Sequence, residues 1–243
     1  MKPTIPVISA AFCFAATALL PVHAGVVSLD LIGDPAVYNT AAESVPSVSQ
    51  IFSDFHPYDS MVLENFHVTS QTGLNVELVE VLFRAQGGFE SFSLVTSFQL
   101  GIFSAAPDGT SLTGDVFSGD WLVSGGLVVV EQVGDGDIGL VKLTTDILLP
   151  SPGTYWVGVV ATGSFAEAGT FHVQSDGKAG ADGGKDGKFI NPSEGFGVGA
   201  AVSTSSDFAY RVTTKVPEPA TPLLLLGGMV VALGIRRRLS PNL

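Results

Sequence analysis

The regular spacing of short strand-like segments constrains the fold of this chain more than any other feature. Between residues 25 and 215, runs rich in β-branched, aliphatic and aromatic residues are separated by turn clusters such as Ala106-Pro107-Asp108-Gly109 and Pro150-Ser151-Pro152-Gly153. Many runs alternate apolar and polar residues, which is typical of strands that bury one face. No segment between them has a convincing helical period. The pattern predicts an all-β domain of about nine or ten short strands.

The fold expected from this pattern is an antiparallel β-sandwich of jelly-roll-like type, because many short strands with Gly- and Pro-rich turns pack as two facing sheets. Tyr155, Val157 and Val159 alternate along one predicted strand and should face the core. Two polar segments, residues 38–46 and 175–188, are expected to be loops. The strands are expected at residues 25–32, 61–69, 76–83, 92–103, 127–133, 138–149, 154–161, 171–174 and 208–213.

Residues 25–215 are enough for one domain with a sizeable core. The only cysteine, Cys13, precedes this segment, so the domain contains no disulfide and must be stabilised by its core. The same residues include 22 Asp and Glu against 7 Lys and Arg, a net charge of −15. The remaining four cations and one acid lie in the terminal segments and bring the whole chain to −12. A surface this acidic repels phosphate groups, which excludes nucleic acid as a partner.

The first 24 residues have the features of a secretory signal peptide. Lys2 provides a positive start, residues 8–20 are almost wholly apolar, and Val22-His23-Ala24 forms a small-residue cleavage site. Cleavage by signal peptidase between Ala24 and Gly25 would begin the mature chain at Gly25. We therefore expect export across the inner membrane.

Residues 216–239 combine three elements in a fixed order. Val216-Pro217-Glu218-Pro219 is rigid and extended, residues 223–235 are apolar, and Arg236, Arg237 and Arg238 form a basic cluster. An apolar segment followed by cations can enter a bilayer and keep its positive end in the cytoplasm. Its 13 residues span about 20 Å as a helix, against about 30 Å of hydrocarbon. The segment predicts one short transmembrane helix that anchors the chain transiently, with a buried C-terminal core helix as the alternative.

This order and spacing resemble the PEP-CTERM sorting domain of exported proteins from Gram-negative bacteria. The matching residues are Pro217, Glu218 and Pro219, the apolar run and the three arginines, and the chain departs from the family pattern in continuing to Leu243. The resemblance implies processing by exosortase, an integral-membrane enzyme. Residues 152–157 also look like the penultimate strand of many PEP-CTERM ectodomains, where they are structural. By resemblance, the destination is the cell surface or extracellular matrix of a bacterium that makes exopolysaccharide and biofilm, with the membrane and exopolysaccharide as partners.

Residues 134–139 match the glycine spacing of a dinucleotide-binding fingerprint. That motif requires a helix immediately afterwards, with its N-terminal amides facing the pyrophosphate. Here residues 140–149 are strand-like, so a β-hairpin turn is the better interpretation and no cofactor is expected. In the two Asp-rich loops we expect solvated turns, with calcium ligation as the alternative. The candidate ligands are Asp135 and Asp137 in one loop, and Asp176, Asp182 and Asp186 in the other.

Catalytic signatures are absent from the sequence. The mature chain has no cysteine nucleophile and no Gly-x-Ser-x-Gly elbow. His56, His67 and His172 are far apart in the chain and form no metal-type pair. Glu77 and Glu80 are expected on opposite faces of one strand, which does not suit the carboxylate pair of a glycosidase, and Glu64 and Glu90 cannot be paired from sequence. We expect no catalytic residue and no metal site.

Three aromatic residues are candidate ligand contacts, because aromatic faces stack on sugar rings in many β-sandwich proteins. Trp121 is expected in a turn at residues 118–121, Tyr58 in a loop at residues 56–59, and Trp156 off the face of Tyr155, where it would be exposed. The alternative for Trp121 and Tyr58 is hydrophobic cover at the end of the sandwich. Two functions follow: an exported structural or adhesion protein of the surface or matrix, and a carbohydrate-binding or carbohydrate-active secreted protein.

Overall fold

The computed structural model describes residues 26–32, 48–71, 73–86, 92–133, 137–175, 187–204 and 206–215. The predicted signal peptide with its cleavage position at Ala24 and Gly25 lies outside these residues. So does the predicted sorting segment, from Val216 to the arginines at residues 236–238. Within the described ranges, no helix is both long and apolar enough to cross a membrane.

Thirteen strands form two sheets in the described part of the chain, which confirms the predicted all-β fold. Neighbouring strands are antiparallel, except that β2 and β9 are parallel. Sheet A has the order β1 (Val26–Asp30), β13 (Tyr210–Lys215), β4 (Leu74–Gln86), β8 (Ile138–Leu149) and β7 (Val128–Gln132), and β10 (Thr170–Val173) pairs with β4. Sheet B has the order β12 (Ala201–Ser203), β11 (Lys188–Ile190), β3 (Met61–Val68), β9 (Gly153–Gly163), β5 (Ser97–Phe103) and β6 (Phe117–Leu122), and β2 (Gln50–Phe52) pairs with β9. The helical turns are η2 (His56–Tyr58), η3 (Phe92–Leu94), η4 (Val123–Gly125) and α1 (Phe165–Ala168).

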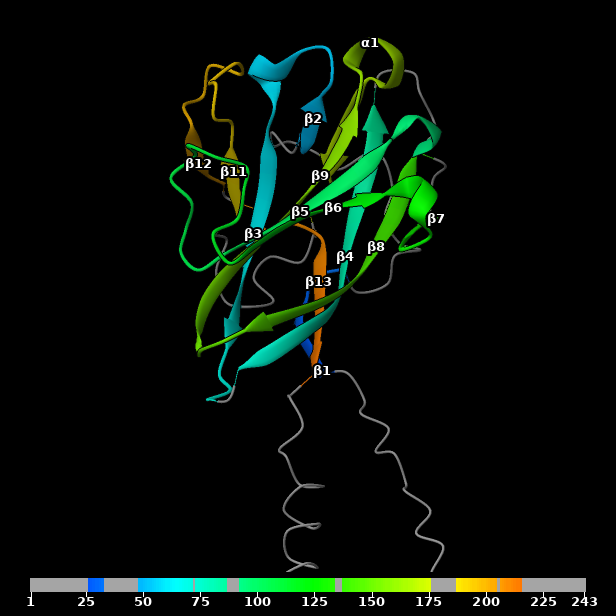
Figure 1. Cartoon of the computed structure of the whole chain (residues 1–243). Helices are drawn as coiled ribbons and strands as arrows, with labels where there is room; N and C mark the ends of the chain where they lie inside the picture. Colours follow the sequence, from blue (N-terminus) through cyan, green and yellow to red (C-terminus); the bar gives the residue numbers. More distant parts are fainter. Residues whose placement is uncertain are drawn as a thin grey trace, which may run out of the picture.

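The main hydrophobic core lies between the two sheets, which face one another in Figure 1. The face predicted from the alternating pattern, Tyr155, Val157 and Val159 of β9, belongs to it. Val79, Val81 and Phe83, which alternate along β4, belong to it as well. Burying one such side chain stabilises a fold by roughly 1.5–3 kcal/mol. Contributions of this kind stabilise a domain that has no cysteine to cross-link it.

Sheet B opens where β2 enters between β3 and β9. Gln50 of β2 exchanges two backbone hydrogen bonds with Ser60 at 3.0 Å and is the pairing partner of Ala161 in β9. Where β3 and β9 are separated, side-chain hydroxyls join the two strands. Ser49 Oγ accepts from the Val62 amide at 3.1 Å and donates to the Val159 carbonyl at 2.6 Å.

Most predicted strands lie close to the observed ones. The predicted segment at residues 138–149 coincides with β8, and that at residues 61–69 exceeds β3 by its last residue. The segment at residues 92–103 divides into η3 and β5. Strand β4 extends beyond residues 76–83 in both directions, because its pairing with β8 runs from Leu74 to Arg84.

Four described strands have no counterpart among the predicted segments: β2, β6, β11 and β12. Three of them have three residues each, which is too short for a period to be recognised. Strand β6 contains Gly119 and Asp120, which disfavour strands. It forms because its backbone pairs with β5 along its whole length. The prediction of nine or ten strands was therefore too low.

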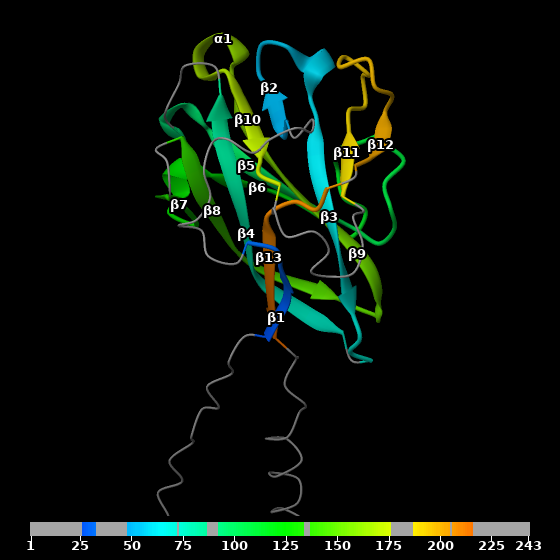
Figure 2. The same ribbon diagram turned by 180° about the vertical axis from the view of Figure 1, so that it is seen from behind.

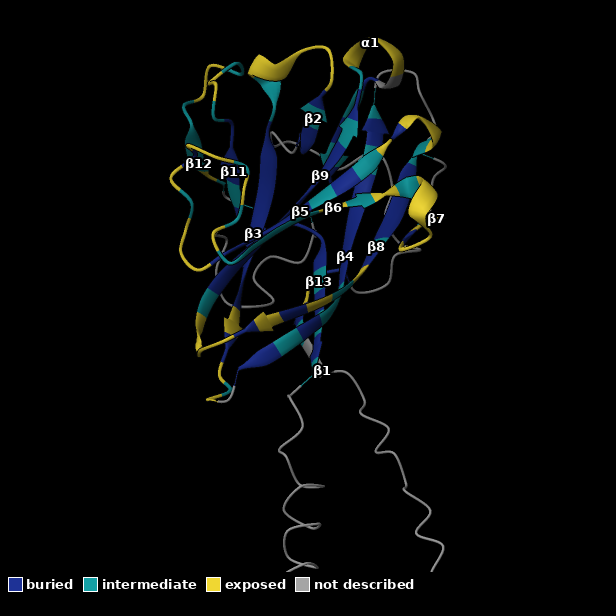
Figure 3. Cartoon of the chain, viewed as in Figure 1, coloured by how far each residue is buried: buried dark blue, intermediate teal, exposed yellow. Residues whose placement is uncertain are grey.

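The two ends of the described domain lie at the same end of the sandwich. Val26 of β1 pairs with Thr214 of β13, next to the last described residue, Lys215. Figures 1 and 2 both place this edge opposite β2, α1 and the turn that connects β11 with β12. We call that opposite end the distal end. Figure 3 shows buried strands in the middle of the molecule and exposed segments at the distal end.

Candidate binding sites

Trp156 is buried, so the prediction that it is exposed is wrong. It does lie off the Tyr155 face, but only 7% of it is exposed. Leu112, from the connection between β5 and β6, lies against the cluster that contains the indole, and Lys188 Nζ is 5.6 Å from its ring centroid. This second hydrophobic cluster consists of Met61, Leu63, Phe103, Trp156, Val160 and Ile190. Trp156 is therefore a structural residue.

Trp121 lies in strand β6 at the edge of sheet B, not in the predicted turn at residues 118–121. Its indole Nε1 donates to the Thr144 carbonyl of sheet A at 3.0 Å, so the side chain bridges the edges of the two sheets. Its ring centroid is 5.8 Å from that of Phe117. Gly119 permits this approach, since a Cβ there would lie 2.8 Å from Phe117 Cζ. The alternative of hydrophobic cover is correct in part, because Trp121 also packs against the main core.

A broad hollow of about 520 Å³ lies beside Trp121, and we call it the Trp121 groove. Its lining combines an aromatic face with apolar side chains, two carboxylates and two threonines. An aromatic face with hydrogen-bonding groups around it is the chemistry that binds sugar rings. The lining side chains are Phe117, Asp120, Trp121, Leu122, Leu127, Thr144, Thr145 and Asp146.

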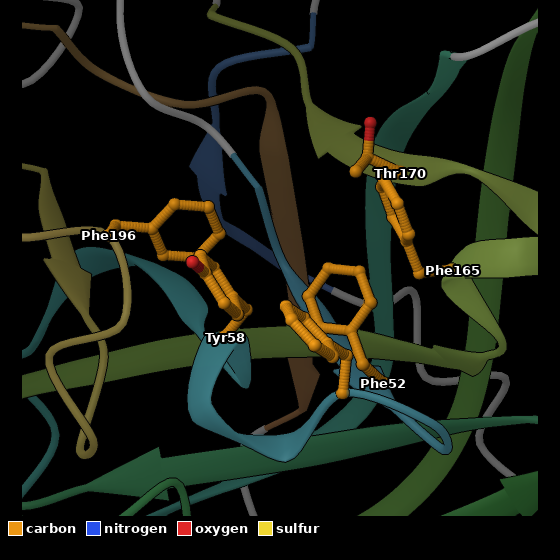
Figure 4. Close-up of a pocket in the computed structure, with 6 residues that line it drawn as sticks. Phe52, Tyr58, Phe165, Thr170 and Phe196 are labelled. Atoms are coloured by element: carbon orange, nitrogen blue, oxygen red, sulfur yellow. The ribbon is translucent and has the colours of Figure 1, made fainter.

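Tyr58 lies at the distal end, in the turn η2 between β2 and β3, where a loop was expected. It lines a pocket of about 290 Å³, which we call the aromatic cup. Figure 4 shows Phe196 and Tyr58 on one side of the cup and Phe165 and Thr170 on the other, with Phe52 between them. The complete lining is Phe52, Phe55, Tyr58, Phe165, Thr170 and Phe196.

The rings of the cup are in mutual contact. Phe55 stacks on Tyr58 with 4.8 Å between centroids, and Phe196 meets Tyr58 edge to face at 5.0 Å. Phe52 is buried and its ring is 6.1 Å from that of Phe165. Phe55 and Phe165 are 51% and 54% exposed. Large exposed aromatic side chains around a hollow are typical of a binding surface.

Asp54 fixes the α1 side of the cup. Its carboxylate accepts hydrogen bonds from the Ala166 amide at 3.1 Å, the Phe165 amide at 2.7 Å and Ser164 Oγ at 2.8 Å. These bonds stabilise the ionised form and lower the pKa of Asp54 to about 2. Ser164 Oγ also accepts from the Glu167 amide at 3.3 Å and so caps α1. An ionised side chain therefore ties α1 to the segment that carries Phe55 and Tyr58.

Asn191 fixes the opposite side. Its Nδ2 donates to the carbonyls of Asp59 at 2.8 Å and Pro57 at 3.2 Å, and its Oδ1 accepts from the Phe196 amide at 3.2 Å. Asn191 is fully buried. The turn that carries Phe196 is thus attached to η2, which carries Tyr58. Hydrogen bonds, and not ring contacts alone, hold the walls of the cup together.

The surroundings of the cup are anionic. The three segments that line it, residues 48–60, 163–172 and 190–200, contain four carboxylates and no lysine or arginine. The carboxylates are Asp54, Asp59, Glu167 and Glu194. Elsewhere in the described chain, four cations pair with carboxylates, namely Arg84, Lys142, Arg211 and Lys215. A cation bound in the cup would therefore meet attractive charge.

The histidines do not form a joint site. His56 Nδ1 lies 3.1 Å from Asp59 Oδ2. His67 Nδ1 lies 2.9 Å from Thr154 Oγ1. His172 is largely buried, and burial, with the charge of Arg84 as a second cause, lowers its pKa to about 4. Across the described ranges, no three His, Cys, Asp or Glu residues are placed to hold a metal ion.

The glutamates considered for catalysis are engaged in the fold. Glu64 is fully buried, and its Oε2 accepts from the Phe208 amide at 2.8 Å. Glu77 pairs with Lys215 at 2.8 Å and Glu80 with Arg211 at 3.2 Å. Glu90 lies outside the described residues.

The predicted hairpin is confirmed by its strands, since β7 and β8 pair as antiparallel neighbours on either side of residues 134–136. Asp137, one of the calcium candidates, bonds to Arg84 Nε at 3.0 Å. The other candidate ligands, Asp135, Asp176, Asp182 and Asp186, lie outside the described residues.

Four aromatic residues of the cup are not among the contacts expected from sequence: Phe52, Phe55, Phe165 and Phe196. The signal that identifies such residues is an aromatic side chain in a polar segment without a strand period, as in residues 52–58. The sequence does not show that these segments meet. Asn191 and Pro57, for example, are 134 residues apart and share a hydrogen bond.

Comparison of the chain with known protein families, curated proteins and solved structures finds no match.

Proposed function

We propose that this is an exported structural or adhesion protein of the cell surface or extracellular matrix of a Gram-negative bacterium, sorted through its PEP-CTERM-like segment. The observation that carries the proposal is the position of the domain's ends: Val26 and Lys215 lie at one end, and the aromatic cup lies at the distal end. A domain attached at one end presents its other end to partners. The sorting motif would begin at Val216, directly after β13.

The proposal includes a jelly-roll-like connectivity of the sandwich and a short transmembrane helix after it. The chain passes repeatedly between the sheets: β3 lies in sheet B, β4 in sheet A, β5 and β6 in sheet B, β7 and β8 in sheet A, and β9 in sheet B. This connectivity supports a jelly-roll-like sandwich. After the sandwich, a short transmembrane helix that ends at Arg236 to Arg238 holds the chain in the inner membrane. An exosortase-like enzyme then removes this helix.

Processing of the two ends tests the proposal. Mass spectrometry of envelope protein from the expressing bacterium should find chains that start at Gly25 and lack Arg236 to Arg238. Replacing residues 217–219 by alanine should leave the tail attached and retain the protein in the inner membrane. Pro241→Ala, beyond the arginines, is the matched control and should be processed normally. Recovery of intact Leu243 from surface protein would contradict the proposal.

Carbohydrate binding at the Trp121 groove is the second candidate function. It is supported by the indole of Trp121, which lies in one hollow with two carboxylates and two threonine side chains. Aromatic rings supply stacking surface for a pyranose, while the polar groups bond its hydroxyls. Trp156 has no part in this candidate function because it is buried.

Affinity electrophoresis tests the second candidate. Gels that contain exopolysaccharide should retard the protein, and Trp121→Ala should abolish the retardation. Trp121→Phe should keep part of it, because a ring remains for stacking. Phe165→Ala, at the distal end, is the control and should run like the unaltered protein. A folded protein that no acidic or neutral polysaccharide retards would exclude this function.

A further inference from the structure

We propose that the aromatic cup binds a free organic cation with a quaternary ammonium head group. This inference goes beyond the structural and carbohydrate-binding functions and does not depend on either. The size of the cup, the chemistry of its walls and the charge around it each favour such a ligand.

The cup is small and its walls are fixed. Its volume of about 290 Å³ is at the lower end of ligand pockets, which hold about 300–1,000 Å³. A single head group fits this volume, whereas an oligosaccharide does not. Asp54 and Asn191 hold two sides of the cup through hydrogen bonds to backbone groups. A site fixed in this way loses little conformational freedom when the ligand binds.

Aromatic faces attract cations because their π electrons make the face of the ring negative. Figure 4 shows rings on both sides of the cup, with Phe196 and Tyr58 opposite Phe165 and with Phe52 between them. A compact ion surrounded by methyl groups can contact several of these rings at once. Quaternary ammonium ions are recognised by aromatic cages of this kind.

The cup offers few hydrogen-bonding groups. Tyr58 and Thr170 are the only lining residues with a side-chain hydroxyl, and Thr170 Oγ1 is already 2.9 Å from His172 Nε2. A sugar would leave buried hydroxyls without partners, which costs free energy. A quaternary ammonium ion has no N–H group and needs no acceptor. The wall chemistry therefore favours this ion over a neutral polar ligand.

The charge around the cup favours a cation that carries no carboxylate. Four carboxylates and no lysine or arginine occur in the three segments that line it. A field of this sign raises the local concentration of cations and repels anionic groups. Choline should therefore bind more tightly than glycine betaine, which combines the same head group with a carboxylate.

Isothermal titration calorimetry of the full chain, purified in a maltoside detergent, tests the proposal. Choline and tetramethylammonium should bind saturably. The neutral isostere 3,3-dimethylbutan-1-ol, with carbon in place of nitrogen, should bind at least about tenfold more weakly because it lacks the cation–π attraction. Glycine betaine should also bind more weakly than choline. Equal binding of choline and its isostere, or no saturable heat with either cation, would overturn the proposal.

Variants of Phe165 separate the aromatic contribution from apolar contact. Phe165→Leu keeps an apolar side chain without a π face and should weaken choline binding about fivefold, whereas Phe165→Tyr should retain it. Leu148→Ala, at an exposed position of β8 outside both hollows, is the control and should bind normally. Circular dichroism verifies that each variant is folded. Unchanged choline affinity in folded Phe165→Leu would overturn the assignment.

A vesicle experiment separates a free cation from a lipid head group. The full chain is transferred from detergent into phosphatidylcholine vesicles, and calorimetry should show the same choline affinity there as in detergent, because the cup does not hold the lipid head group. A loss of choline affinity in these vesicles would overturn the assignment to a free cation.

Discussion

Tyr210 joins the two sheets through one buried hydroxyl. It belongs to β13 of sheet A, and its hydroxyl donates to the Val62 carbonyl at 2.9 Å and accepts from the Val159 amide at 3.1 Å in sheet B. Burial is the main cause that raises its pKa, so the hydroxyl keeps its proton and remains a donor. Together with Ser49, it satisfies the backbone groups of β3 and β9 where these strands separate.

Tyr210→Phe should lower the free energy of unfolding by about 2 kcal/mol, because it leaves buried backbone groups of Val62 and Val159 without this partner. Urea denaturation followed by circular dichroism measures the loss. Tyr155→Phe is the matched control, since that hydroxyl bonds to the Ser151 carbonyl in a partly buried position. Its effect should be smaller, and an equal loss in the two variants would contradict the prediction.

His172 should make stability depend on pH in a defined window. Its pKa is about 4 in the folded protein, against an ordinary value of 6.5. Between these values the unfolded chain binds more protons, so stability is fully present above about pH 6.5 and falls as the pH decreases toward 4. The loss should reach roughly 3 kcal/mol at most.

Urea denaturation at several pH values between about 4.5 and 7, which covers most of the interval between the two pKa values, tests this expectation for His172. His172→Gln should flatten the profile, while His67→Gln, at an exposed strand position, should keep it. Identical profiles for the unaltered protein and His172→Gln would show that another group is responsible.

At the scale of elements, α1 depends on a side chain from a distant segment. Four residues are too few for a stable isolated helix. The carboxylate of Asp54, 111 residues before Phe165, binds the amides at its start. The Asp54 carboxylate therefore stabilises both the helix α1 and the wall of the cup that α1 carries.

Asp54→Ala should loosen α1 without unfolding the sandwich. Hydrogen exchange measured by mass spectrometry should become faster at the amides of Phe165 and Ala166, because both lose their acceptor. Asp108→Ala is the control, since Asp108 accepts from Thr110 in its own turn. In the unaltered protein the Asp54 contact should persist above its ordinary pKa of 3.8 and be lost as the pH falls toward 2. Unchanged exchange at both amides in Asp54→Ala would contradict the prediction.

The observed strands also show where sequence patterns are sufficient to predict a strand. Strands β3 and β8 were predictable because their residues alternate or run continuously apolar over a long stretch. Strands β6 and β11 were not, because neighbouring strands supply the backbone partners that make them strands. Strand identity at such positions depends on contacts that local composition does not encode.

At the scale of the whole molecule, the excess of acidic residues opposes compaction. Residues 25–215 carry a net charge of −15, and four of the described cations already pair with carboxylates. The remaining carboxylates repel one another across the surface. Screening by salt should reduce this repulsion.

The melting temperature should therefore rise by a few degrees as sodium chloride is raised from low ionic strength to about 0.5 M. Differential scanning fluorimetry at constant pH measures the shift. Sodium and potassium chloride should act alike if screening is the cause. A melting temperature that is constant or decreases with salt would contradict the prediction.

The sequence by itself determined the all-β class, the position of the long strands and the terminal segments on which the export proposal depends. Only the tertiary structure decided which aromatic side chains are accessible. Trp156 points away from Tyr155, as alternation requires, but other segments cover that face and bury it. The cup forms because Asp54 and Asn191 join segments that are distant in the chain. Periodicity gives the direction of a side chain from its own strand, whereas exposure depends on what the rest of the chain packs against it.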